Sequence, residues 1–259
     1  MIDKWLEERK TTLFRDLVSE YIENRLFFEE IFEIHNKTGR MHYAMIEHWV
    51  GSESCKGKLW ALKDRCHRLL RSEKKQESIL EYLFDWTIGS IFHQCMKLKE
   101  DVYQLDAYVP QYERLTNGEN TNGNIAGIIK EMEHRMNAIS TSLRGELEEV
   151  ASLFKTADAH LLRFLPQYSD NSLLVRFLIQ SRNKFERVFG TQSLDHILTA
   201  MYPAGRHEAY YMAGLSYLEG GWYKEAVYLF QTGLAMAPGH EGLRKALADA
   251  RMSEEQNME

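Results

Sequence analysis

Apolar residues recur every three or four positions over most of the chain, a spacing that places them on one face of an α-helix. The first such stripe predicts a helix over 3–35, which ends at the turn-forming segment 36–39. A shorter helix to Val50 follows, and a second long helix is predicted over about 76–108. Because that helix carries apolar residues on two faces, we expect it to lie at the centre of a bundle.

A cluster of Asn and Gly at 117–124 interrupts this pattern, since these residues favour turns. After it, apolar intervals of three, four and four predict one long helix from about residue 125 to the stop at Pro166. A helix of this length needs a partner, which is either the N-terminal helices of the same chain or a second copy in a homo-oligomer. Residues 170–202 predict two further helices broken at Gly190.

Together these segments predict an all-α protein, in which a bundle of long helices precedes a short C-terminal helical-hairpin region. Only 4 prolines and 16 glycines in 259 residues agree with nearly continuous helix. We expect four parts: an N-terminal bundle at 1–116, a linker at 117–124, a long helix with a hairpin at 125–202, and the C-terminal region at 203–259.

Small and aromatic residues alternate at fixed intervals between residues 207 and 240. These positions and a closing proline are Tyr210, Gly214, Tyr217, Ala226, Phe230 and Pro238. Their spacing is similar to that of the tetratricopeptide repeat, a unit of about 34 residues built from two antiparallel helices. The resemblance implies a tight hairpin at 207–240 and a capping helix at about 241–252, while 173–206 has a repeat's length without its pattern.

The same resemblance implies a class of function, because tetratricopeptide arrays bind peptides or protein segments in a groove lined by first helices. The corresponding positions here are Glu208, Tyr211, Met212, Leu215 and Glu219. The leading hypothesis is therefore an adaptor, chaperone or regulatory scaffold with a protein or peptide partner. The alternative for these positions is that they pack on the chain's own upstream helices.

A second class of function is a ligand- or metal-sensing helical bundle that uses buried histidines. Glu131 and His134 have the Glu-x-x-His spacing that places two ligands on one helical face. His93 follows Gly89 by one turn on an apolar face, where a missing side chain leaves room for a ligand. The competing interpretations are a solvated helix face for the pair and a hydrogen-bonded core histidine for His93.

Recognisable catalytic motifs are missing from the sequence: it has no Gly-rich phosphate loop, no Gly-x-Ser-x-Gly and no Cys/His nucleophile context. An enzymatic role therefore has little support, and no cofactor is predicted. The net charge of −6 argues against extensive nucleic-acid binding. A basic amphipathic stretch at 56–75 suits either phosphate or an anionic membrane surface, or else ordinary pairing with acidic neighbours.

The compartment is predicted from the cysteines and the hydropathy pattern. Cys55, Cys66 and Cys95 are odd in number and lack Cys-x-x-Cys spacing, which is typical of reduced thiols. The first residues carry scattered charges, and we find neither a signal peptide nor an apolar run long enough for a membrane span. We therefore expect a cytoplasmic protein.

Overall fold

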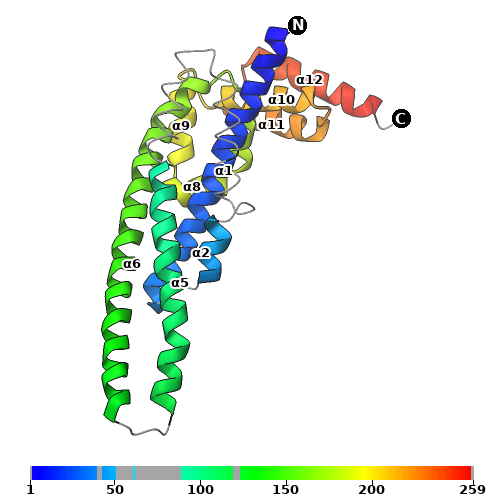
Figure 1. The fold of residues 1–259 in the computed structure, drawn as a ribbon. Coiled ribbons are helices and arrows are strands. Elements are labelled where there is room, and N and C mark those ends of the chain that lie inside the picture. Colours follow the sequence, from blue (N-terminus) through cyan, green and yellow to red (C-terminus); the bar gives the residue numbers. More distant parts are fainter. Residues whose placement is uncertain (1, 40–42, 51–60, 62–88, 119–122, 258–259) are drawn as a thin grey trace. The chain divides into compact units, whose positions relative to one another are not determined.

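The computed structural model describes residues 2–39, 43–50, 61, 89–118 and 123–257. In these parts of the chain every regular element is a helix, which confirms the all-α prediction (Figure 1). The basic stretch at 56–75, apart from Ala61, and the first part of the helix predicted over 76–108 lie outside the described residues. None of the helices described is both long enough and apolar enough to cross a membrane.

Four helices form the first part of the described chain. They are α1 (Ile2–Thr38), α2 (Tyr43–Val50), α5 (Gly89–Asn117) and α6 (Gly123–Phe164). The predicted end near residue 108 was wrong, because α5 continues through Pro110 to Asn117. A proline inside a helix costs about 3 kcal/mol, so the last turns need other support. One such contact is the Tyr112 hydroxyl, which donates to Glu133 on α6 at 2.8 Å.

Shorter helices follow α6. They are the 3₁₀ helix η2 (Leu165–Tyr168), α7 (Ser172–Gln180), α8 (Arg182–Phe189), α9 (Ser193–Met201), α10 (His207–Glu219), α11 (Tyr223–Met236) and α12 (Glu241–Gln256). The break predicted at Gly190 is present, with φ of +98° at that residue. A second break at Ser181, where ψ is 18°, divides the segment into three helices instead of two.

The contacts divide the chain into two compact units. Among the described residues, the C-terminal unit comprises 2–22 and 158–257, and the long-helix unit comprises 23–39, 43–50, 61, 89–118 and 123–157. The boundaries fall inside α1 and inside α6. In the sequence, the Asn/Gly-rich segment at 117–124 therefore connects α5 to α6, and both of these helices contribute to the long-helix unit.

The core of the long-helix unit contains an aromatic cluster formed by Phe28 of α1, Trp49 of α2 and Phe154 of α6. The ring centroid of Phe28 lies 5.0 Å from that of Phe154 and 5.5 Å from that of Trp49. All three side chains are buried. Aromatic rings at these separations gain both apolar burial and favourable ring geometry.

Polar contacts attach α2 to α5 in the same unit. The backbone N–H of Tyr43, at the first position of α2, donates to the Asp106 carboxylate at 2.7 Å. Lys99 of α5 forms an ion pair with Glu47 of α2, and its ammonium holds the pKa of the Glu47 carboxyl below the usual range. A carboxylate at a helix start satisfies an N–H group that has no partner within the helix.

In the C-terminal unit, α10 packs against α7, α11 and α12. The first part of α1 also belongs to this unit, and the ring of its Phe14 stacks on that of Tyr168 in η2 at a centroid distance of 4.0 Å. The Tyr21 hydroxyl donates to Asp158 at 2.6 Å. Burial raises the pKa of the Tyr168 phenol, with a further contribution from nearby Asp170.

Candidate binding surface on the C-terminal helices

The α10–α11 hairpin depends on a very close approach of its two helices. A methyl group at Gly214 of α10 would overlap the ring of Phe230 on α11, which is fully buried. Ala226 is also fully buried. Two helices can approach this closely only where the facing residue of one of them has no bulky side chain. The tight hairpin expected at 207–240 is therefore present.

A second close approach, at Gly233, was not predicted from the sequence. A methyl group at Gly233 of α11 would lie 3.0 Å from both terminal methyls of Leu243 on α12, and 3.4 Å from the carbonyl oxygen of His207. Gly233 thus lets α12 pack onto the hairpin. A glycine in the middle of a helix is a recognisable signal for such contacts, since it weakens the helix unless packing requires it.

Four of the groove positions predicted from the sequence share one side of α10, which we call the α10 face: Glu208, Met212, Leu215 and Glu219. Their spacing of three to four residues places them on a common side of the helix. Glu219 is exposed and the other three are half-buried. This side carries partly accessible apolar groups between two carboxylates.

Tyr211, the fifth predicted position, lies at the edge of the α10 face and also takes part in internal packing. Its ring centroid is 6.2 Å from that of Phe230 and 5.6 Å from that of His240. The side chain is half-buried. Tyr211 therefore contacts the downstream helices α11 and α12, whereas the alternative interpretation had these positions packing on upstream helices.

A pocket of about 510 Å³ lies on the opposite side of α10. Its lining includes Tyr210 and Tyr217, which are roughly half a helical turn away from Met212 and Leu215. The other lining residues belong to α7, α8 and α11: Arg176, Ile179, Gln180, Arg182, Lys224, Glu225, Tyr228, Leu229 and Thr232. The guanidinium of Arg176 lies 4.7 Å from the Tyr217 ring centroid. Two of the residues that line the pocket therefore already form a cation–π contact with each other.

Three polar side chains meet where α10 and α12 begin, and we call them the His-Glu-His cluster: His207, Glu208 and His240. Glu208 Oε1 lies 2.9 Å from His240 Nε2 and 3.6 Å from His207 Nε2. His240 Nδ1 also accepts a hydrogen bond from the Leu243 backbone N–H at 3.0 Å, which caps α12. Sequence reasoning missed this cluster, because His240 reaches Glu208 only after α12 packs onto the hairpin.

The three residues proposed for metal or ligand binding in the bundle are all exposed. His93 is exposed on α5, so the position expected for it on a buried face is wrong. Glu131 and His134 are exposed on α6, and Glu131 pairs with Arg135 at 2.9 Å. The expected buried histidines are thus wrong for His93 and His134, because solvent covers the sides of α5 and α6 on which they lie.

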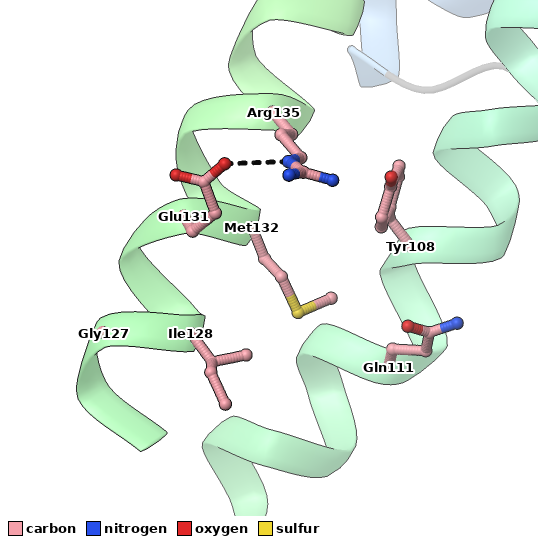
Figure 2. A pocket seen from close by; sticks show the side chains of 7 residues that line it. All are labelled: Tyr108, Gln111, Gly127, Ile128, Glu131, Met132 and Arg135. Atoms are coloured by element: carbon pink, nitrogen blue, oxygen red, sulfur yellow. Dashed lines mark hydrogen bonds and ion pairs between the residues drawn. The ribbon is translucent and has the colours of Figure 1, made fainter. Parts of the chain in front are cut away.

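Glu131 nevertheless lines a shallow pocket of about 400 Å³ between α5 and α6 (Figure 2). Tyr108 and Gln111 of α5 face Met132 and Arg135 of α6 across it. The Glu131–Arg135 ion pair is visible within one wall of this pocket (Figure 2). Since both charged groups are exposed and paired with each other, the pocket offers little unbalanced charge to a ligand.

Two half-buried carboxyl groups lie in the long-helix unit, at Glu146 of α6 and Asp101 of α5. Within the described chain, neither Glu146 Oε2 nor Asp101 Oδ2 has a hydrogen-bond partner. Burial raises the pKa of Glu146 to about 7, and the nearby Asp101 carboxylate adds to this increase. The Glu146 carboxyl therefore titrates near neutral pH.

The chain was compared with protein families, with curated proteins and with solved structures. No family model matches it, and no match to it was found among the curated proteins or the solved structures.

Proposed function

We propose that this chain is a helical adaptor that binds a protein or peptide segment on the α10 face. The observation that carries the proposal is the packing of α10, which contacts α7, α11 and α12 and yet leaves Met212 and Leu215 partly exposed. Partly exposed apolar side chains on a rigid helix offer anchor positions at little entropic cost.

The proposed architecture of this surface is that of a tetratricopeptide-like repeat followed by a capping helix. Support comes from the Gly214–Phe230 contact and from Gly233, which together bring α10, α11 and α12 into close packing. In such repeats the first helix presents its free side to the partner. The α10 face is the free side here.

The exposed carboxylate of Glu219 should make the α10 face prefer partners that carry a basic residue. A segment with two apolar anchors and a basic residue beside them would complement both the apolar side chains and this charge. The apolar anchors supply most of the binding free energy, whereas an exposed charge contributes about 1 kcal/mol or less.

A matched pair of double variants tests the proposal. Met212→Ser with Leu215→Ser changes the α10 face, whereas Lys224→Ser with Tyr228→Ser changes the opposite side of the hairpin, where Tyr228 is 66% exposed. Tagged full-length protein captures partners from native extract, and circular dichroism checks folding. We expect at least a tenfold loss of capture with the first variant, because an apolar anchor is worth about 2 kcal/mol.

The control variant should capture its partners at the wild-type level. If the Met212/Leu215 variant is folded and retains full capture, the α10 face is not the binding surface. If only the Lys224/Tyr228 variant loses capture, the binding surface is the opposite side of the hairpin.

A further inference from the structure

The His-Glu-His cluster has the ligand types of a transition-metal site. Two imidazoles and one carboxylate form a donor set that binds Zn²⁺ in proteins, with water in the remaining position. One ligand atom from each of His207, Glu208 and His240 lies within 4.8 Å of the other two. Among the described residues no other group of three such side chains comes this close.

The distances from Glu208 to the two histidines are near those that a bound ion requires. Ligands at about 2.0–2.1 Å from a tetrahedral zinc ion stand roughly 3.4 Å from one another. Glu208 Oε1 is 2.9 Å from His240 Nε2 and 3.6 Å from His207 Nε2. Shifts of a few tenths of an ångström in the carboxylate therefore bring both pairs to the required separation.

The cluster is accessible to an ion, and the backbone around it is shaped to hold the rings. The side chains of His207, His240 and Glu208 are 17%, 23% and 27% exposed. Gly205 has φ of +133°, and a methyl group there would lie 2.6 Å from His207 Nδ1. This loop thus needs a glycine both for its backbone conformation and to make room for the imidazole.

We propose that His207, Glu208 and His240 bind one zinc ion, with water completing the coordination. The ion joins the first turn of α10 to the start of α12. This site is distinct from Glu131 and His134, and it does not depend on the partner proposed for the α10 face.

The hydrogen bonds of His240 give metal binding a specific signature. Nδ1 accepts from the Leu243 N–H, and Nε2 faces the Glu208 carboxylate, so the ring carries its proton on Nε2 when no ion is bound. Coordination through Nε2 requires this proton to be carried by Nδ1. The hydrogen bond from Leu243 is then lost, and the Leu243 amide reports directly on binding.

Calorimetric titration of Zn²⁺ into metal-free full-length protein tests the site. We expect one saturable ion per chain and a loss of affinity of more than about tenfold in both His207→Ala and His240→Asn. Asparagine at position 240 can still cap α12 through its side-chain oxygen, so this variant removes the imidazole and keeps the helix start. The matched control, Glu131→Gln with His134→Ala, should bind zinc as the wild type does.

Amide NMR spectra supply the second readout. Zinc should shift the Leu243 resonance in the wild type and leave it in place in His207→Ala and His240→Asn at the same zinc concentration. Failure to bind a stoichiometric ion, unchanged affinity in both ligand variants, or loss of binding in the control instead would each overturn the proposal.

Discussion

In the α10–α11 hairpin two helices meet through a glycine, whereas in the long-helix unit three helices meet through large aromatic rings. Gly214 lies against Phe230 with no space for a methyl group, whereas Phe28 packs against both Trp49 and Phe154. The first contact depends on the absence of a side chain, and the second depends on side-chain volume. Added atoms should therefore damage the hairpin, and removed atoms should damage the long-helix unit.

The largest effect is expected from Phe28→Ala in the aromatic cluster. Removing a buried phenyl ring leaves a cavity between Trp49 and Phe154 and should lower the free energy of unfolding by about 3–5 kcal/mol. Urea denaturation followed by circular dichroism measures the change. Ile34→Ala on the same helix is the control, because Ile34 is 40% exposed and should lose less than about 1 kcal/mol. Equal losses in the two variants would contradict the cluster's role.

Gly214→Leu should produce the next largest effect, by adding volume where the hairpin has none. The new side chain would overlap the Phe230 ring, and overpacking of this kind costs about 1–3 kcal/mol. Thermal unfolding measures the loss, and Ala226→Leu should behave similarly since Ala226 is fully buried. Unchanged stability in both variants would show that the two helices do not meet at these residues.

The half-buried carboxyl of Glu146 should make the stability of the long-helix unit depend on pH. Its folded-state pKa of about 7 exceeds the ordinary value of 4.5, so its contribution is fully present below pH 4.5 and is lost as pH rises through 7. After allowance for partial exposure we expect a loss of about 1–2 kcal/mol over this range. Urea denaturation at a series of pH values should show this loss in the wild type and a smaller one in Glu146→Gln. Parallel profiles for the two proteins would contradict it.

The smallest effect is expected from Gly145→Ala in α6, and its sign should be opposite to that of the Gly214 substitution. A methyl group at Gly145 meets no atom within 4 Å, so alanine gains helix propensity without a clash. The expected gain is about 0.5–1 kcal/mol, measured by urea denaturation. Destabilisation would mean that Gly145, like Gly214, lies in a close helix contact.

The difference between the α10–α11 hairpin and the long-helix unit also explains which features could be predicted from the sequence. The hairpin contacts could be predicted, because Gly214, Tyr217 and Phe230 are close in sequence and their spacing is specific. The helices of the long-helix unit could be predicted from their apolar stripes, but a stripe does not name the helix that it packs against. This is why His93 was assigned to a buried side of α5 although it is exposed.

The polar groups within the fold were the hardest to predict. Glu146 lies three residues after Leu143 and four before Val150, so it occupies the apolar stripe of α6, and this was the signal available for its burial. His240 is far from His207 and Glu208 in sequence. Only the packing of α12 brings the three side chains together, which local patterns do not encode.

Site-specific photo-crosslinking directly tests whether the α10 face binds a protein segment. A photoreactive amino acid is placed at Met212, on that face, or at Tyr228, on the opposite side of the hairpin, and the folded full-length proteins are irradiated in native extract. If the α10 face binds the partner, covalent adducts with partner protein form from position 212 and few or none form from position 228. Adducts from position 228 alone, or the absence of adducts from position 212, would contradict it.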